Sequence, residues 1–375
     1  MKFLFILISF SLLNTLALAG DRELAWKLHN RIAGVPPRMD VLNQMTSMIA
    51  QGDAEGAAYL AMENPNFYNV TLKNWIKPWS NRDQTPRVAF NDYVATILGI
   101  IRDDVSFDKI LYDDILYVVD NGNLPAYSNT DNQHYQNAEN QRLDFMNTLV
   151  VRRQSDLTGL PSSAVAGVTT TRSSGENYFQ AGTNRRVNRF IFMNYLCKDY
   201  EDLHDITVPD FRVARDVERN PGGDSRTYKS RCVGCHAGQD ALRGAYAYYN
   251  FGNGRLNYTQ GQVQGKFNQN NYFPQGFVTT NDAWINLWAT GQNSTLGWRG
   301  NNSGTGAQSL GLMFSQTKAF SSCMARKVFK LVCMKEAKSS EDVAFVNQEA
   351  ISFESGYNMK RLIAQTSAGC VINEN

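Results

Sequence analysis

The chain has 375 residues, of which 43% are hydrophobic, and its 37 basic side chains nearly balance its 35 acidic ones. This length is enough to bury a sizeable core, in one large domain or a few small ones. The balanced charge argues against a nucleic-acid partner, and an aromatic content of 11% argues against low-complexity disorder.

The N-terminus has the pattern of an export signal. Lys2 gives a positive start, residues 3–13 are an apolar stretch too short to span a bilayer comfortably, and Ala17-Leu18-Ala19 is a small-x-small cleavage site. We therefore predict a cleavable signal peptide over 1–19 and a periplasmic or secreted bacterial protein. No later segment has the pattern of a transmembrane helix, so we expect none in the mature chain.

The next 180 residues predict mainly helices. Pro36-Pro37 ends the first of them, Ser106 is a candidate cap for the fourth, and the polar stretch 120–137 predicts a loop between domains. Helical spacing of apolar residues covers six stretches: 22–33, 38–63 (broken at Gly52), 88–102, 106–119, 138–153 and 184–200.

The second half of the chain predicts a short helix, a long irregular stretch and a helical end. Asp224 or Ser225 can cap a helix that runs to about His236, and Gly238 can end it. Residues 244–311 are rich in Gly, Asn, Gln and aromatic residues, which predicts short strands and turns. Helical spacing returns over three stretches: 316–335, 341–353 and 357–366.

The segment Cys232-Val233-Gly234-Cys235-His236 carries the most specific motif of the chain. On a helix, residues three and four positions apart share one face. Two thiols at that spacing can add to the two vinyl groups of a haem, and the histidine can reach the iron from one side. We therefore predict one covalent haem c, with Cys232 and Cys235 as anchors and His236 as the proximal iron ligand.

Three other interpretations of the CxxC spacing stay open. The pair could be a thioredoxin-like redox dithiol, although no βαβ pattern surrounds it. It could be half of a zinc site, although no second CxxC or paired histidine supplies the other ligands, or it could form a small structural disulfide. An export signal favours haem, because c-type haem is attached outside the cytoplasm.

The distal ligand of the iron is not determined by the sequence. Weak candidates are Met193, His204 and Met313, each of which is more typical of ordinary core or surface packing. A methionine would raise the reduction potential, a histidine would lower it, and an open position would allow ligands to bind. This choice separates an electron carrier from a haem enzyme, and catalytic residues stay unknown.

Two groups of side chains near the motif have alternative roles. Arg185, Arg186 and Arg189 could pair with haem propionates, but a solvated helix face is favoured for them. The aromatic stretch 245–251 could wall a haem or fill the core. Three tryptophans could form a sugar-binding surface, but packing of the irregular stretch is favoured for them: Trp284, Trp288 and Trp298.

Four further cysteines predict up to two disulfides in an oxidising compartment: Cys197, Cys323, Cys333 and Cys370. Cys323 and Cys333 are separated by roughly 15 Å along one predicted helix, so they cannot pair with each other. Cys197 is therefore expected to pair with one of them and Cys370 with the other, and the sequence does not choose between these two patterns.

Several stretches of the chain match the modules of a known family: 30–37 with Trp75 and Trp79, 90–94, 159–172, 183–186, 220–226 with CxxCH, and 320–358. On these stretches the chain resembles the planctomycete-type multi-module cytochrome c family, in a proteobacterial branch. The resemblance implies a single haem at CxxCH, surrounded by helical modules of unknown function. Relatives often carry a methionine shortly after the haem histidine, whereas Gln239 and Asp240 stand here, so the resemblance supplies no distal ligand.

These observations predict a mostly α fold, with multi-helix cytochrome-c-like modules and an irregular Gly-, Asn- and aromatic-rich insertion. The expected function is periplasmic electron transfer to or from a redox partner protein. Alternatives are a peroxidase- or oxygenase-like haem oxidoreductase with an open distal site, and a haem-containing surface binding or sensing protein. The expected parts after the signal peptide are an N-terminal helical module (20–125), a middle helical module (126–200), a haem module with the loop excursion (201–315) and a C-terminal helical module (316–375).

Overall fold

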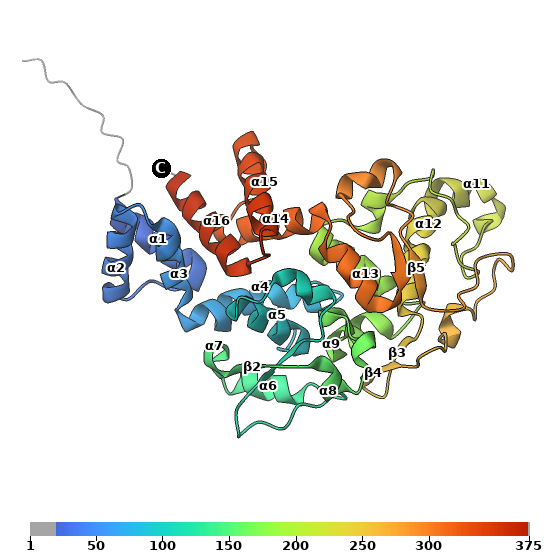
Figure 1. Cartoon of the computed structure of the whole chain (residues 1–375), viewed down its shortest axis with the longest axis horizontal. Coiled ribbons are helices and arrows are strands. Elements are labelled where there is room, and N and C mark those ends of the chain that lie inside the picture. The colour runs from blue at the N-terminus through green and yellow to red at the C-terminus, as the bar shows by residue number, and fades with distance from the viewer. Residues whose placement is uncertain (1–19, 374–375) are drawn as a thin grey trace, which may run out of the picture.

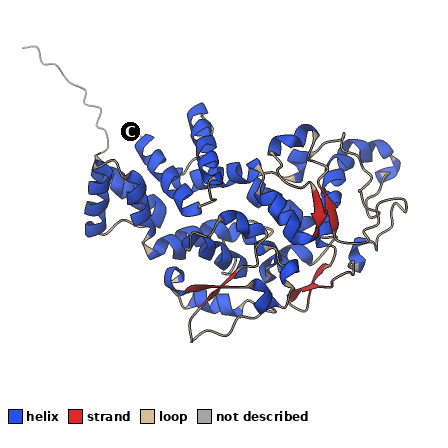
Figure 2. Cartoon of the chain, viewed as in Figure 1, coloured by secondary structure: helices blue, strands red, loops and turns tan. Residues whose placement is uncertain are grey.

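The computed structural model describes residues 20–373, and the predicted signal peptide over 1–19 lies outside them. The described chain is mostly helical, which confirms the predicted class (Figure 2). Its strands form three two-stranded antiparallel sheets, β1–β2, β3–β4 and β5–β6. Their bounds are β1 Leu116–Val119, β2 Leu149–Arg152, β3 Tyr249–Gly252, β4 Arg255–Tyr258, β5 Ala283–Ile285 and β6 Ser303–Thr305.

The α-helices are distributed along the whole described chain (Figure 1). Ten lie within the first 200 residues: α1 Asp21–Ala33, α2 Met39–Ala50, α3 Ala54–Met62, α4 Lys73–Ile76, α5 Asp92–Arg102, α6 Gln133–Asn140, α7 Phe145–Thr148, α8 Gln154–Thr158, α9 Arg172–Ser174 and α10 Arg185–Ile191. Six more follow: α11 Ser225–Thr227, α12 Val233–Leu242, α13 Gly306–Ser315, α14 Lys318–Cys333, α15 Ser340–Glu354 and α16 Met359–Asn373.

The two ends of the described chain pack together. Helix α16 lies beside α1 and α3, and α14 packs against both α15 and α16 (Figure 1). Apolar residues on these helices, such as Leu28, Ile32 and Ile363, are fully buried in one core that extends from Leu24 to Val371. Burial of these apolar stripes supplies the main stabilisation of the arrangement. Helix α12 lies at the far end of the longest axis from α1–α3 (Figure 1).

The central helix α5 shows how the sequence determines where a helix begins and ends and which of its faces are buried. The Asn91 side chain accepts a hydrogen bond from the Val94 N–H and caps the first turn, and Arg102 occupies the last turn. Its first ten residues, 92–101, are all buried. A helix that is buried on every side needs neighbours on every side, and α5 packs against β1, α4 and α9, among others.

The predicted helix over 106–119 is wrong. The chain forms a short 3-10 segment, η3 (Phe107–Leu111), followed by the strand β1, and the Ser106 side chain makes no cap hydrogen bond. The helical segment ends at Leu111, and Asp114 then holds the chain beside a distant segment, because its carboxylate accepts hydrogen bonds from the N–H and the hydroxyl of Ser155. The β-branched residues that follow are buried and pair with β2.

The predicted helix over 138–153 is also wrong in its second half. Helix α6 ends at Asn140, Asp144 caps the single turn α7, and the chain then extends into β2. The 244–311 stretch contains short strands and turns as predicted, but its end already belongs to α13. The last helix is longer than the predicted 357–366, since α16 continues to Asn373.

Candidate functional site

The CxxCH motif lies within a continuous helical stretch of three parts. Helix α11 is capped by the Asp224 side chain, a π-helical segment η10 (Tyr228–Cys232) follows, and α12 continues to Leu242. The prediction that Gly238 ends the helix is wrong. A side chain at Gly238 would clash with the Trp288 ring, so this glycine allows close packing inside the helix rather than a left-handed cap.

The three residues of the predicted haem attachment share the open side of this stretch. Cys232, Cys235 and His236 are each half-buried, whereas Gly234 and Ala237 between and after them are buried. Positions three and four apart on a helix lie on one face, so both thiols and the imidazole are presented together. The structure thus brings the three predicted residues onto one accessible face.

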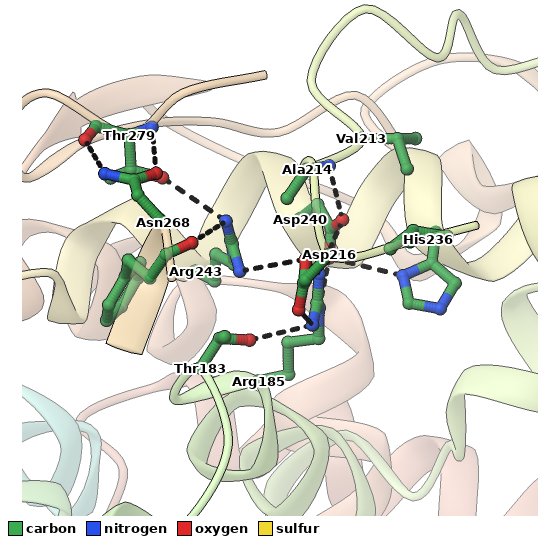
Figure 3. Close-up of polar contacts among 12 residues, drawn as sticks. Thr183, Arg185, Val213, Ala214, Asp216, His236, Asp240, Arg243, Asn268 and Thr279 are labelled. Atoms are coloured by element: carbon green, nitrogen blue, oxygen red, sulfur yellow. Dashed lines mark hydrogen bonds and ion pairs between the residues drawn. The ribbon is translucent and has the colours of Figure 1, made fainter. Parts of the chain in front are cut away.

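The His236 ring is oriented by a carboxylate one turn further along α12. Its Nδ1 lies 3.4 Å from the Oδ1 of Asp240, and its other ring nitrogen faces away from that carboxylate (Figure 3). A hydrogen bond from Nδ1–H to Asp240 fixes the tautomer in which Nε2 has a free lone pair, which is the state of a metal-ligating histidine.

Asp240 belongs to a buried ion cluster that the sequence analysis did not find (Figure 3). Arg185 donates two hydrogen bonds to the Asp240 carboxylate. It donates two more to the Asp216 carboxylate, with lengths of 2.6 and 2.8 Å. The Ala214 N–H donates a further hydrogen bond of 2.9 Å to Asp240, and Arg243 Nη1 lies 3.8 Å from Asp216. The one available signal in the sequence was the spacing of four between His236 and Asp240.

The charges of this cluster compensate one another. Burial alone would raise the pKa of the Asp240 carboxyl, but the Arg185 charge and the His236 hydrogen bond hold it well below its usual range. Burial likewise acts against the charge of Arg243 and lowers its pKa to about 10. The cluster therefore keeps a carboxylate, rather than a carboxylic acid, beside His236.

A cavity of about 380 Å³ opens beside Cys235, between α12, α10 and the 3-10 segment η8 (Tyr200–Leu203). Arg186 lines this cavity, and its buried Nη1 has no hydrogen-bond partner within residues 20–373. Burial lowers the pKa of Arg186. A guanidinium nitrogen without a protein partner is available to an anionic group in the cavity, and a haem propionate has the required charge.

The three arginines of the predicted cluster have three different environments. The favoured interpretation, a solvated helix face, is wrong for Arg185, which is held in the buried ion cluster. It describes Arg189, which is exposed and pairs with Asp199 at 2.6 Å. Arg186 lines the cavity and has a buried Nη1 without a hydrogen-bond partner within residues 20–373, so the alternative of pairing with a propionate falls on this residue.

The six cysteines form two disulfides and leave two free thiols, and the pairing agrees with the prediction that Cys323 and Cys333 do not bond to each other. Cys197 pairs with Cys323 and Cys333 pairs with Cys370, while Cys232 and Cys235 are free thiols. Cys323 and Cys333 both lie on α14, which confirms that they do not pair with each other. Burial, followed by the charges of nearby acidic side chains, raises the pKa of the Cys235 thiol.

The three weak candidates for a distal ligand lie in different places. The His204 ring packs against the backbone of Gly234, since a methyl group added there would lie 2.7 Å from its Nε2. On a helix, Gly234 points away from the face of Cys235 and His236, so His204 lies behind that face. Met313 is buried in the main core on α13, and Met193 is half-buried on η7 (Phe192–Leu196), which packs against α14.

The aromatic residues after the motif serve mainly as core. Trp284 and Trp288 are buried, which confirms packing rather than a sugar-binding surface for these two, while Trp298 is half-buried. Tyr246 and Tyr249 from the 245–251 stretch are also buried in the main core.

The comparisons with known proteins identified no relative of this chain. Family models, curated proteins and solved structures were all searched, and none matches the chain. Within residues 20–373, the helices fall short of the length and hydropathy that crossing a membrane requires. The resemblance to planctomycete-type cytochromes therefore stays a prediction, and a functional conclusion depends on the residues of the site.

Proposed function

We propose that this protein is an exported monohaem c-type cytochrome that transfers electrons. The observation that carries the proposal is the joint presentation of Cys232, Cys235 and His236 on one half-buried helix face. The adjoining cavity, with the unpartnered Nη1 of Arg186, supports it independently. The thiol-pair and zinc half-site interpretations assign no role to this nitrogen.

Each residue of the site has a distinct role in this proposal. The Cys232 and Cys235 sulfurs would hold the haem covalently, His236 Nε2 would bind its iron, and Asp240 orients the imidazole through its Nδ1–H. Arg186 provides a positive charge for a propionate. When bound, the haem would supply one-electron redox chemistry, and the buried ion cluster holds Asp240 and so the orientation of the His236 ring.

A pyridine haemochrome spectrum tests the proposal. Protein produced with the haem-maturation machinery should show one covalent c-type haem per chain, which survives denaturing electrophoresis. Cys232→Ser combined with Cys235→Ser should abolish covalent attachment, whereas the matched pair Cys333→Ser and Cys370→Ser, which removes a disulfide, should retain it. Absence of covalent haem in the unmodified chain would contradict the proposal.

One observation favours a haem oxidoreductase as a second candidate. A carboxylate that accepts the Nδ1–H of an axial histidine makes that ligand a stronger donor. The His236–Asp240 pair has this form. The ferric spectrum separates the two candidates: a high-spin form that binds azide indicates an open enzyme site, and a low-spin form that resists azide indicates an electron carrier.

A further inference from the structure

A second, larger cavity lies away from the CxxCH helix, between the N-terminal helices and α14. Its volume is about 960 Å³ and it is open to solvent. One wall carries Trp75 and Trp79, whose rings meet edge to face at 4.8 Å, and the other wall is the exposed side of α14. Cys197, which follows η7, also lines the cavity and is joined to α14 by its disulfide with Cys323.

The α14 wall and the loop after it are cationic. Four basic side chains and one acidic side chain line the cavity: Arg326, Lys327, Lys330, Lys335 and Glu336. Two of the cations are already compensated, because Lys330 pairs with Glu336 at 2.5 Å and Lys335 pairs with Asp342 at 2.9 Å. The excess positive charge therefore resides on Arg326 and Lys327.

Lys327 is the unusual member of this set. It is partly buried, and within residues 20–373 its ammonium has neither an ion pair nor a hydrogen bond. Its contact is with the face of the Trp79 ring, 4.3 Å from the ring centre. Burial, reinforced by the charge of Lys330, lowers its pKa to about 7. The ammonium therefore faces an open cavity without a carboxylate to neutralise it within residues 20–373, and an anionic ligand could pair with it there.

The other residues that line the cavity indicate the chemical nature of the rest of the anion. Trp75 is half-buried and presents indole surface to the cavity, and Leu331 and Met334 add apolar surface at its edge. Flat rings stack on indole, whereas a bare inorganic anion gains nothing from it. The combination of an aromatic platform and an uncompensated ammonium is therefore matched by a ligand with a ring and an acidic group.

We propose that this cavity binds a small ring-bearing carboxylate, whose carboxylate contacts Lys327 and whose ring packs on Trp75. The site is separate from the CxxCH face, and the proposal does not depend on haem. Arg326, which is exposed and lies beside Lys327 in the sequence, adds long-range attraction for the anion.

Calorimetric titration with 2-naphthoate tests this site in the full-length mature protein. We expect binding with a dissociation constant below about 1 mM, and at least about tenfold weaker binding of 2-naphthamide, which has the same shape without the charge. Lys327→Gln and Trp75→Leu should each weaken naphthoate binding at least about tenfold. Lys266→Gln is the matched control, since Lys266 is also a partly buried lysine but donates to the Phe179 carbonyl and to Asn250.

Three outcomes would overturn the proposal. These are no naphthoate binding by the unmodified chain, equal binding of the acid and the amide, and unchanged binding by Lys327→Gln. A circular dichroism spectrum of each variant verifies its fold. If Trp75→Leu fails to fold, Trp75→Phe replaces it and should retain most of the binding, because a ring remains.

Discussion

The helical stretch of η10 and α12 carries one pair of cysteines and α14 carries another, and each lines a candidate site, but α12 and α14 differ in how their buried charges are compensated. On α12, Asp240 is fully compensated by Arg185, and the cysteines are free. On α14, Lys327 has no compensating anion within residues 20–373, and both cysteines are in disulfides. The first helix holds its charges for structural support, and the second leaves one available to a ligand.

The contrast shows that residue type alone does not assign a role. Cysteines three positions apart present both thiols to one accessible face, whereas cysteines ten positions apart on a helix reach different neighbours. Likewise, an arginine close to the motif is structural if carboxylates surround it, and a candidate ligand-binding group if they do not. The surroundings of a charge, rather than its position in the sequence, decide its role.

Removing the disulfides of α14 should have the largest effect on stability. Loop-closure entropy predicts a loss of about 5 kcal/mol for Cys197→Ala with Cys323→Ala and about 4 kcal/mol for Cys333→Ala with Cys370→Ala, from separations of 126 and 37 residues. Urea unfolding of the haem-free chain measures both. Cys232→Ala with Cys235→Ala should change the same quantity by less than about 1 kcal/mol, and a larger loss would erase the contrast between the helices.

Replacing Arg185 should have the next largest effect. Arg185→Met leaves the carboxylates of Asp216 and Asp240 buried without their main partner, which should destabilise the protein by about 3–5 kcal/mol. Lys327→Met removes an unpaired cation and should cost little or even stabilise the protein. Thermal unfolding of both variants tests this difference, and similar losses would show that Lys327 is paired after all.

Acid should weaken the ion cluster in a defined direction. Burial opposes ionisation of Asp216, but hydrogen bonds and charge from Arg185 leave its pKa lowered. A lowered native pKa contributes stability above the unfolded value of about 4, and this contribution is lost as the pH falls further. Asp216→Asn should therefore reduce the slope of stability against pH below pH 4 by up to about 1.4 kcal/mol per pH unit. An unchanged slope in urea unfolding would contradict this role of Asp216.

The smallest expected effect concerns Arg186 and depends on the proposed haem. A positive charge beside a propionate favours the reduced state, so Arg186→Gln should lower the reduction potential by tens of millivolts. Arg189→Gln should lower it less, because Asp199 already compensates that exposed arginine. Spectroelectrochemical titration compares the two variants. Equal shifts would mean that Arg186 is not the propionate partner.

Sequence patterns predicted the regular helices well, because caps and apolar spacing are local. Helices α1, α5, α14 and α15 appear close to their predicted ranges. The failures at 106–119 and 138–153 have a common origin: these segments contain the two strands β1 and β2, which pair only with each other. Pairing between distant segments overrides local helical spacing, and one sequence alone does not display it.

The candidate site was predictable only in its outer part. The CxxCH spacing identified Cys232, Cys235 and His236, and the helix length excluded one of the possible disulfide patterns. The ion cluster was not predictable, because Arg185, Asp216 and Asp240 come from three distant segments that the fold brings together. The favoured assignment of Arg185 to a solvated face failed for the same reason.

The packing of α16 against α1 and α3 has a consequence for the timing of folding. Helix α3 ends at Met62 and α16 begins at Met359, so synthesis at about 5–20 residues per second separates them by roughly 15–60 s. During that interval, the apolar faces of the first helices have no C-terminal partner. A nascent chain of this design must keep its beginning from aggregating until its end arrives, and loss of α16 would extend that vulnerable period indefinitely.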